Sequence, residues 1–195
     1  RFAAFEVGAA PFNIPKTKRS FQWYAAKYDP ATCGGLCNCP AALARIREAW
    51  ALTEHPTSVS RVAWAPNGRW IYFVAPDEKT EQQKKRDEAK DDVFRYDEDY
   101  QQEHLWRMSP DGGDPERLTE GDFSVSDYHL SRDGTQLTSY RRPAPVWDNG
   151  KGEVWLANAD GSSARQLTNN SVPERGAQLS PDNSQVLFTG FFNEE

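Results

Sequence analysis

The chain has 195 residues, which is enough for one domain with a real hydrophobic core. It carries 23 Lys and Arg against 29 Asp and Glu, and this net charge of −6 argues against a nucleic-acid-binding surface. No run of about 18 apolar residues occurs, so we expect no membrane-spanning helix. Seven tryptophans and a single methionine favour packed β-sheets over a helical bundle.

Residues 1–51 show the weakest pattern. Residues 20–25 are similar to the predicted strand at residues 60–65, which indicates a strand here as well. After a proline, the apolar side chains of residues 41–50 share one helical face, so we expect a short helix. We interpret the region as a degraded or partial repeat that precedes the clearer ones.

Three cysteines lie close together in this first region: Cys33, Cys37 and Cys39. A structural zinc site needs pairs of ligands at short spacing and a second pair further along, which the sequence does not provide. Neighbouring glycines and a proline instead favour a loop that is disordered or pinned by a disulfide. We expect no metal and no cofactor.

Residues 52–119 contain two predicted hairpins, one turned at Asn67-Gly68 and one at Asp111-Gly112. An insertion at residues 77–103 separates them and carries eleven acids against six bases. Residues 80–90 are mostly strong helix formers without an apolar stripe, so we expect a solvated helix or a mobile arm.

Residues 118–168 form the clearest unit, with four strands turned at Asp133-Gly134 and Asp160-Gly161. Asp-Gly is a strong hairpin signal, because both residues of such a turn are expected to accept positive φ. Residues 167–195 repeat the first half of this unit, with a turn at Asp182-Asn183.

The repeats keep a constant spacing. Forty-nine residues separate Ser131 from Ser180, and the same number separates Leu118 from Leu167. One unit earlier the spacing is longer, and the excess falls within the insertion. A period of roughly 40–50 residues with four strands is typical of a β-propeller. We predict an all-β fold, a partial β-propeller built from four-stranded antiparallel blades, with a charged insertion that can form a helix. Chance spacing of turns in a β-sandwich is the alternative.

The predicted blades occupy residues 52–119 and 118–168, and residues 167–195 supply the first half of a further blade. A propeller needs more blades than these to close, and the chain starts at Arg1 without a leader sequence. We therefore expect a fragment of a longer protein, truncated at both ends.

The connections between strands divide into two sets. Successive strands of a blade are antiparallel, so the tight turns share one end and the long loops share the other. The long loops are the insertion and residues 120–127, 141–152 and 169–176. Function tends to lie on long loops held by a rigid scaffold, so we expect binding at the long-loop end.

Large apolar residues at the inward positions of the strands are predicted to be largely buried, since alternate residues of a strand point to opposite faces. The predicted core residues are Trp64, Trp106, Leu130, Leu137, Trp155, Leu179, Val186 and Phe188.

Two sets of motifs carry a family resemblance. Residues 64–73, together with the turns at 130–134 and 179–183, resemble the propeller repeat shared by TolB-type proteins and serine peptidases of the prolyl oligopeptidase family. Residues 104–106 and those around the Leu-Thr pairs, 117–122 and 167–174, are similar to the propeller half of bacterial dipeptidyl or acylaminoacyl peptidases of that family. The resemblance covers about residues 50–195.

This resemblance implies two alternative functions. In the first, the chain gates and orients short peptide substrates for an α/β-hydrolase domain that lies C-terminal to it. In the second, it is a TolB-like protein- or ligand-binding propeller of the cell envelope without enzymatic activity. The sequence has no G-x-S-x-G motif, and none of His55, His104 and His129 stands in a triad context, so we expect no catalytic residue in this chain. A bacterial periplasmic, secreted or cytoplasmic location is equally compatible with these readings.

Charged residues of the long-loop end are the candidate substrate-binding groups. Clustered carboxylates could hold the free ammonium of a peptide, and arginines could meet a substrate carbonyl or carboxylate. The candidates are Asp97, Glu98, Asp99 and Glu174 for the ammonium, and Arg141 and Arg142 for the carbonyl or carboxylate. The alternative is that these are solvated loop charges or mutual ion pairs.

Overall fold

The computed structural model of the chain describes residues 2–5, 24–27, 49–51, 55–91, 93, 95, 99–146, 152–170 and 172–190. The chain divides into two compact units, Arg1–Val59 and Ser60–Glu195, and each is treated by itself. No helix among the described residues is long and apolar enough to cross a membrane.

The first unit contains a three-stranded antiparallel sheet of β1 (Phe2–Phe5), β2 (Tyr24–Lys27) and β3 (Ala49–Ala51). The strand predicted at residues 20–25 is confirmed for its last two residues, which begin β2. The predicted helix is wrong at its end, because Ala49 and Trp50 pair with β2 as part of β3. Sheet hydrogen bonds here override a local helical pattern. The rest of that predicted helix, and the three cysteines, lie outside the described residues.

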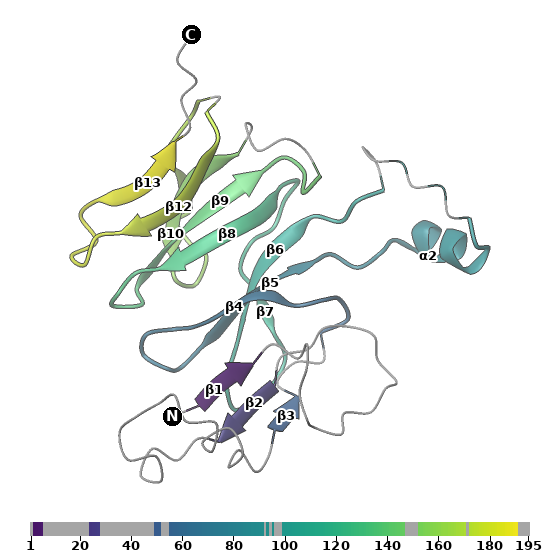
Figure 1. The fold of residues 1–195 in the computed structure, drawn as a ribbon, viewed down its shortest axis with the longest axis horizontal. Coiled ribbons are helices and arrows are strands. Elements are labelled where there is room, and N and C mark those ends of the chain that lie inside the picture. The colour runs from purple at the N-terminus through teal and green to yellow at the C-terminus, as the bar shows by residue number, and fades with distance from the viewer. Residues whose placement is uncertain are drawn as a thin grey trace, which may run out of the picture. The chain divides into compact units, whose positions relative to one another are not determined.

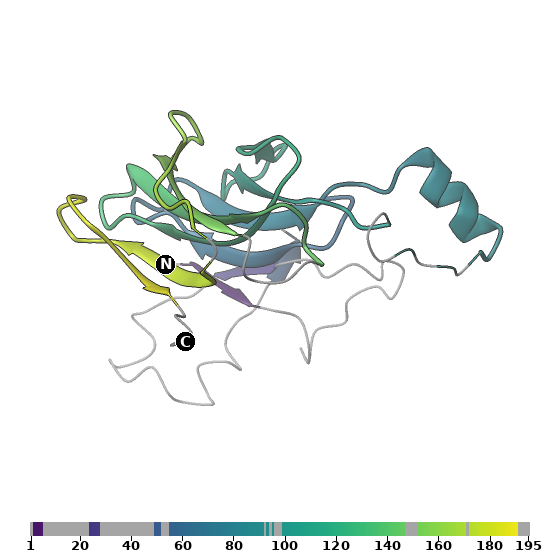
Figure 2. The ribbon, with the colours of Figure 1, turned by 90° about the horizontal axis from the view of Figure 1, so that it is seen from above.

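The second unit contains two four-stranded antiparallel sheets and one pair of strands (Figures 1 and 2). The first blade consists of β4 (Ser60–Trp64), β5 (Ile71–Pro76), β6 (Glu103–Met108) and β7 (Glu116–Arg117). The second blade consists of β8 (Ser124–Leu130), β9 (Gln136–Arg142), β10 (Glu153–Asn158) and β11 (Arg165–Gln166). The strand pair is β12 (Glu174–Leu179) with β13 (Val186–Gly190), and helix α2 (Glu81–Glu88) lies in the insertion. The predicted all-β fold with four-stranded antiparallel blades is confirmed.

The hairpin turns differ in geometry from the prediction. In the β8–β9 turn, the Gly134 amide donates to the Ser131 carbonyl at 2.9 Å, and Gly134 alone in this turn has positive φ, at 71°. The Asp133 carboxylate accepts hydrogen bonds from the Ser131 hydroxyl and the Thr135 amide at 2.7 and 3.0 Å. Asn183, at φ 60°, takes the equivalent place in the β12–β13 turn. The expectation of positive φ at both turn residues is therefore wrong, because this longer turn needs the left-handed conformation at only one position.

Each Leu-Thr pair closes a blade by bonding its last strand to the one before it. The Leu118 amide donates to the Leu105 carbonyl at 2.8 Å, and the Thr119 hydroxyl accepts the Leu105 amide at 2.9 Å. Leu167 and Thr168 bond to Val154 in the same way, each at 2.8 Å. The threonine hydroxyl satisfies a backbone amide that the short last strand leaves unpaired, which explains why Leu-Thr recurs with the blade period.

The main core of the second unit lies between the two blades. Tyr72 and Val74 of the first blade pack with Leu137 and Ala157 of the second, and all four are buried. The Tyr72 hydroxyl also donates to the Ala159 carbonyl at 2.8 Å, which joins the two blades at the tight-turn end. Leu137 and Ala157 are directly opposite each other in the sheet, so they define the face of β9 and β10 that is turned toward the first blade.

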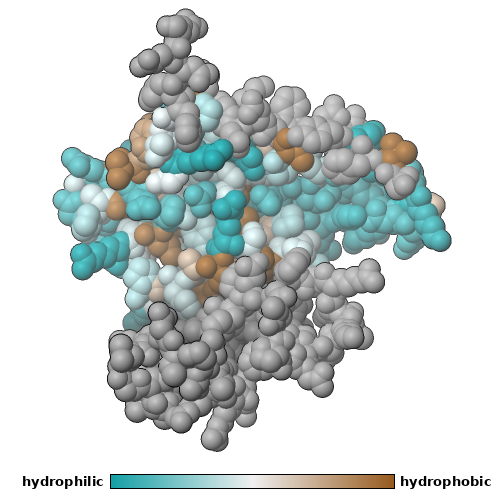
Figure 3. Space-filling view, in the orientation of Figure 1, coloured by the Kyte–Doolittle hydropathy of each residue, from teal (hydrophilic) through white to brown (hydrophobic). Residues whose placement is uncertain are grey.

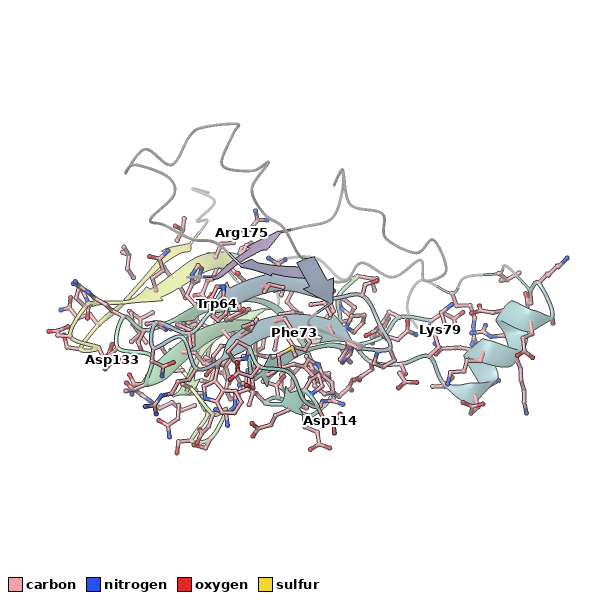
Figure 4. All side chains as sticks on the ribbon, turned by 90° about the horizontal axis from the view of Figure 1, so that it is seen from below. Trp64, Phe73, Lys79, Asp114, Asp133 and Arg175 are labelled. Atoms are coloured by element: carbon pink, nitrogen blue, oxygen red, sulfur yellow. The ribbon has the colours of Figure 1, made fainter. Side chains whose placement is uncertain are left out.

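The predicted core residues are only partly confirmed. Leu137 is buried, Phe188 is 39% exposed, and the other six are half-buried. On β10, Val154 and Leu156 are buried on one face, and Trp155 is half-buried on the other face, which it shares with the buried Ala157. The prediction took these residues as the inward positions of alternating strands, but an indole such as that of Trp155 is rarely covered completely. Phe73, which was not among the predicted core residues, is fully buried (labelled in Figure 4). Its ring stacks on that of Trp106, with ring centroids 6.5 Å apart.

At Gly161 the backbone of the second blade approaches that of the first closely. A Cβ added there would lie 2.4 Å from the Leu118 carbonyl oxygen. Gly112 also has positive φ, at 98°, but an added Cβ would meet nothing within 4 Å.

We expect Gly161→Ala to destabilise the chain more than Gly112→Ala. Both substitutions force alanine into the left-handed region, which costs about 1–2 kcal/mol. Only Gly161→Ala also drives a methyl group into a backbone carbonyl, which adds about 1–3 kcal/mol. Urea unfolding followed by tryptophan fluorescence measures both free energies of unfolding. An equal decrease in the free energy of unfolding for the two variants would contradict the observed contact between the blades.

Candidate functional site

The long loops of the second unit meet around Gln102. Its Nε2 donates to Asp122 Oδ1 at 2.9 Å and to the Pro143 carbonyl at 2.8 Å, and its Oε1 accepts the Ser124 hydroxyl at 2.6 Å. These contacts join the base of the insertion to the β7–β8 and β9–β10 loops. The predicted clustering of the long loops is thus confirmed for three of the four, and this end of the two blades is called the long-loop end below.

The insertion forms a polar arm at this end. Its two strands meet at the base, where the Asp77 amide donates to the Gln102 carbonyl at 2.8 Å. Helix α2 begins with a capping box, in which Thr80 and Gln83 bond to each other's backbone amides at 3.2 and 2.8 Å. The helix buries no residue and presents a hydrophilic surface away from the blades (Figures 1 and 3). The predicted solvated helix is confirmed.

Asp99 stabilises the arm from within. Its carboxylate accepts hydrogen bonds from both η nitrogens of Arg86 on α2 and from the Arg95 amide, the last at 2.9 Å. The Arg86 guanidinium, with help from that amide, holds the pKa of Asp99 well below its usual range. Both oxygens are therefore occupied inside the arm. Asp97 and Glu98 lie outside the described residues.

Glu174 is buried at the start of β12 and orders the loop that precedes it. It accepts hydrogen bonds from the Thr168 hydroxyl at 2.6 Å and from Asn170 Nδ2 at 2.8 Å. Since α2 and β12 lie on opposite sides of Figure 1, the structure does not bring Asp99 and Glu174 together. Both carboxylates have structural partners instead of a shared site.

Arg141 and Arg142 end β9, which extends two residues into the predicted loop. They are adjacent in a strand, so their side chains leave opposite faces of the sheet. Arg141 belongs to the face turned toward the first blade, the face of Leu137, and the half-buried Arg142 belongs to the other. Only Arg141 therefore contributes to the region between the two blades.

The Arg141 guanidinium lies between two aromatic rings. Its Cζ is 4.7 Å from the centroid of Phe123 and 4.5 Å from that of Trp155. Its Nε donates to the buried Ser139 hydroxyl at 3.2 Å. Burial lowers the pKa of Arg141 to about 10, which still leaves the side chain charged at neutral pH.

Phe123 connects Arg141 to a buried histidine of the first blade. The His104 ring meets Phe123 edge-on with centroids 5.7 Å apart, and its Nδ1 is 3.2 Å from Thr119 Oγ1. Its Nε2 lies 3.5 Å from a carboxylate oxygen of Asp77. Burial, and then the positive charge of Arg117, lower the pKa of His104, so the imidazole is neutral at pH 7. Thr119 is itself buried and already accepts a backbone amide, so this arrangement does not provide an exposed nucleophile.

No group of three or more His, Cys, Asp or Glu side chains within the described part of the chain could hold a metal ion. The residues that sequence reasoning missed are Gln102, Phe123 and His104. A short-range pattern does not identify them, because they come together only when the two blades pack. The single available signal was their position beside predicted strand ends.

We expect Asp99→Asn to loosen the arm, because the Arg86 guanidinium loses its ionic partner. Hydrogen exchange measured by mass spectrometry should show faster exchange of the α2 amides. Asp87→Asn is the matched control, since Asp87 pairs with Lys79 at 2.6 Å on the exposed surface, where such pairs contribute little. Unchanged exchange in Asp99→Asn, or equal acceleration in both variants, would contradict the bracing role of Asp99.

No protein-family model and no curated protein matches the sequence, whereas several solved structures match the fold. A TolB-like protein from Agrobacterium tumefaciens has 20% identity and a TM-score of 0.53, with 89% of this chain and 51% of that chain covered. TolB from Acinetobacter baumannii has 14% identity and a TM-score of 0.50, with coverage of 87% and 32%. The tricorn protease has 10% identity and a TM-score of 0.52, with coverage of 87% and 13%. The chain thus spans about half or less of each of these proteins, and at such identities the likeness establishes the fold alone. The fold is that of a TolB-like β-propeller.

Proposed function

We propose that the chain is the non-catalytic propeller portion of a serine peptidase of the prolyl oligopeptidase family. In this role its long-loop end gates and orients short peptides for an α/β-hydrolase domain that follows it in the full-length protein. The observation that carries the proposal is the Arg141 guanidinium, held between two aromatic rings at the end where the long loops meet. The likeness to the tricorn protease and the resemblance of the Leu-Thr motifs to peptidase propellers support it.

The chemistry in this proposal belongs to the hydrolase domain. A serine activated by histidine would form an acyl-enzyme there, and water would release the product. The propeller would act before that step, because a peptide held in a fixed orientation needs less entropy loss to reach the nucleophile. The rigid blades and the braced arm suit this positioning role.

The second candidate is a TolB-like propeller that binds a protein or ligand without catalysis. It is favoured by the two TolB likenesses, whose identities of 20% and 14% exceed the 10% of the tricorn protease. The two candidates predict different reactivities for the full-length protein.

A fluorophosphonate probe separates the two candidates, since it labels only activated serines. We expect no labelling of the 195-residue chain and stoichiometric labelling of the full-length protein at a serine outside residues 1–195. Peptide mapping by mass spectrometry locates the label. Absence of labelling in the full-length protein would favour the binding propeller, and labelling of any serine within residues 1–195 would contradict both.

A further inference from the structure

The side chain of Arg141 is fixed before any ligand arrives. Its Cζ lies over the rings of both Phe123 and Trp155, and the Ser139 hydroxyl accepts its Nε–H group. An arginine on the surface loses much rotamer freedom when it binds a ligand, whereas this one has already lost it on folding. The guanidinium is therefore pre-organised for recognition.

The charge of Arg141 is not balanced by a carboxylate in the part of the chain that the structure describes. Three arginines of the first blade and the arm are closely paired with an acid: Arg86 with Asp99, Arg107 with Glu116 at 2.7 Å, and Arg117 with Asp77 at 3.0 Å. No described residue accepts a hydrogen bond from the η nitrogens of Arg141. Its cross-strand neighbour Glu153 accepts the Asn170 amide at Oε1, at 2.8 Å, whereas the buried Oε2 of Glu153 has no hydrogen-bond partner among the described residues.

A partly buried cation without a counter-charge is costly, so proteins usually pair it or use it for a ligand. The lowered pKa of Arg141 has burial as its cause and is consistent with this cost. Arg141 nevertheless stays partly buried and charged at the long-loop end, where three long loops meet.

The surroundings favour a ligand with a single negative charge. The neighbouring His104 is neutral at pH 7, and Arg117 is already bound to Asp77, so neither of these two side chains adds a free positive charge beside Arg141. Glu120 and Asp122 lie in the adjoining β7–β8 loop and repel any anion, but a dianion such as a phosphate monoester about twice as strongly as a monoanion. A carboxylate matches both this charge and the planar fork of the guanidinium.

We propose that Arg141 is the specificity-determining residue of a subsite between the two blades, which binds a carboxylate of a peptide. Phe123 and Trp155 form the apolar walls of the subsite, and the guanidinium forms two parallel hydrogen bonds to the ligand. This subsite rests on the proposed function, because both require that the protein binds peptides. It would give the protein a preference for peptides with a free C-terminus or an acidic side chain.

Isothermal titration calorimetry on the full-length protein tests this subsite without turnover. The probes are N-acetyl-trialanine, which ends in a carboxylate, and N-acetyl-trialanine amide, which does not. We expect the carboxylate peptide to bind roughly 10–100-fold more tightly, as two charge-assisted hydrogen bonds would give. The amidated peptide N-acetyl-Ala-Asp-Ala amide shows whether a side-chain carboxylate is also accepted.

Arg141→Gln should abolish the preference, and Arg141→Lys should keep only part of it, because lysine keeps the charge without the planar fork. Arg132→Gln removes an equal charge from an exposed tight turn and should leave the preference intact. Thermal unfolding identifies any variant that fails to fold, and the Lys variant then carries the test.

Equal affinity of the wild-type protein for the carboxylate and amide peptides, or no binding of either at millimolar concentration, would overturn the inference. So would an unchanged preference in Arg141→Gln. The outcome is separable from that of the proposed function. If the protein prefers the carboxylate peptide but is not labelled by the fluorophosphonate, the subsite stands and the peptidase role fails. If the protein is labelled but shows no preference for the carboxylate peptide, the peptidase role stands and the subsite fails.

Discussion

The packing of the second blade on the first is the interaction on which the rest of the second unit depends. Tyr72 and Val74 meet Leu137 and Ala157 in a buried layer, which sets the side of β9 that faces the first blade. Because strand side chains alternate, the same choice places Ser139 and Arg141 on that side and Arg142 on the other. The position of the candidate site thus follows from the register of an apolar interface.

Much of the fold could be predicted because each blade repeats a local rule. The Leu-Thr pair recurs since Thr119 and Thr168 each satisfy a backbone amide, and the turns recur since one position needs Gly or Asn. The burial of single residues could not be predicted as well. Trp155 is only half-buried although it shares the strand face of the buried Ala157, so the face that a residue occupies does not by itself fix how far the neighbouring sheet covers it.

The candidate site, too, could be predicted only in part. The long-loop end followed from strand parity alone, and Arg141 was among the residues that it contained. Asp99 and Glu174 were expected to join one acidic cluster. The sequence did not reveal that Asp99 is bonded to Arg86 and Glu174 to Thr168. These partners are 13 and 6 residues away in the chain and meet their carboxylates only through the folded arm and loop. Sequence patterns locate charges, whereas the fold decides which charges remain available to a ligand.

The central claim is that Arg141 is held between the rings of Phe123 and Trp155. Proton NMR tests this directly, because protons above the face of an aromatic ring are shifted upfield by its ring current. We expect a strong upfield shift of the Arg141 Hδ protons, reduced by Trp155→Leu and again by Phe123→Leu. Hδ shifts at the values of a solvent-exposed arginine, unchanged by either substitution, would contradict it.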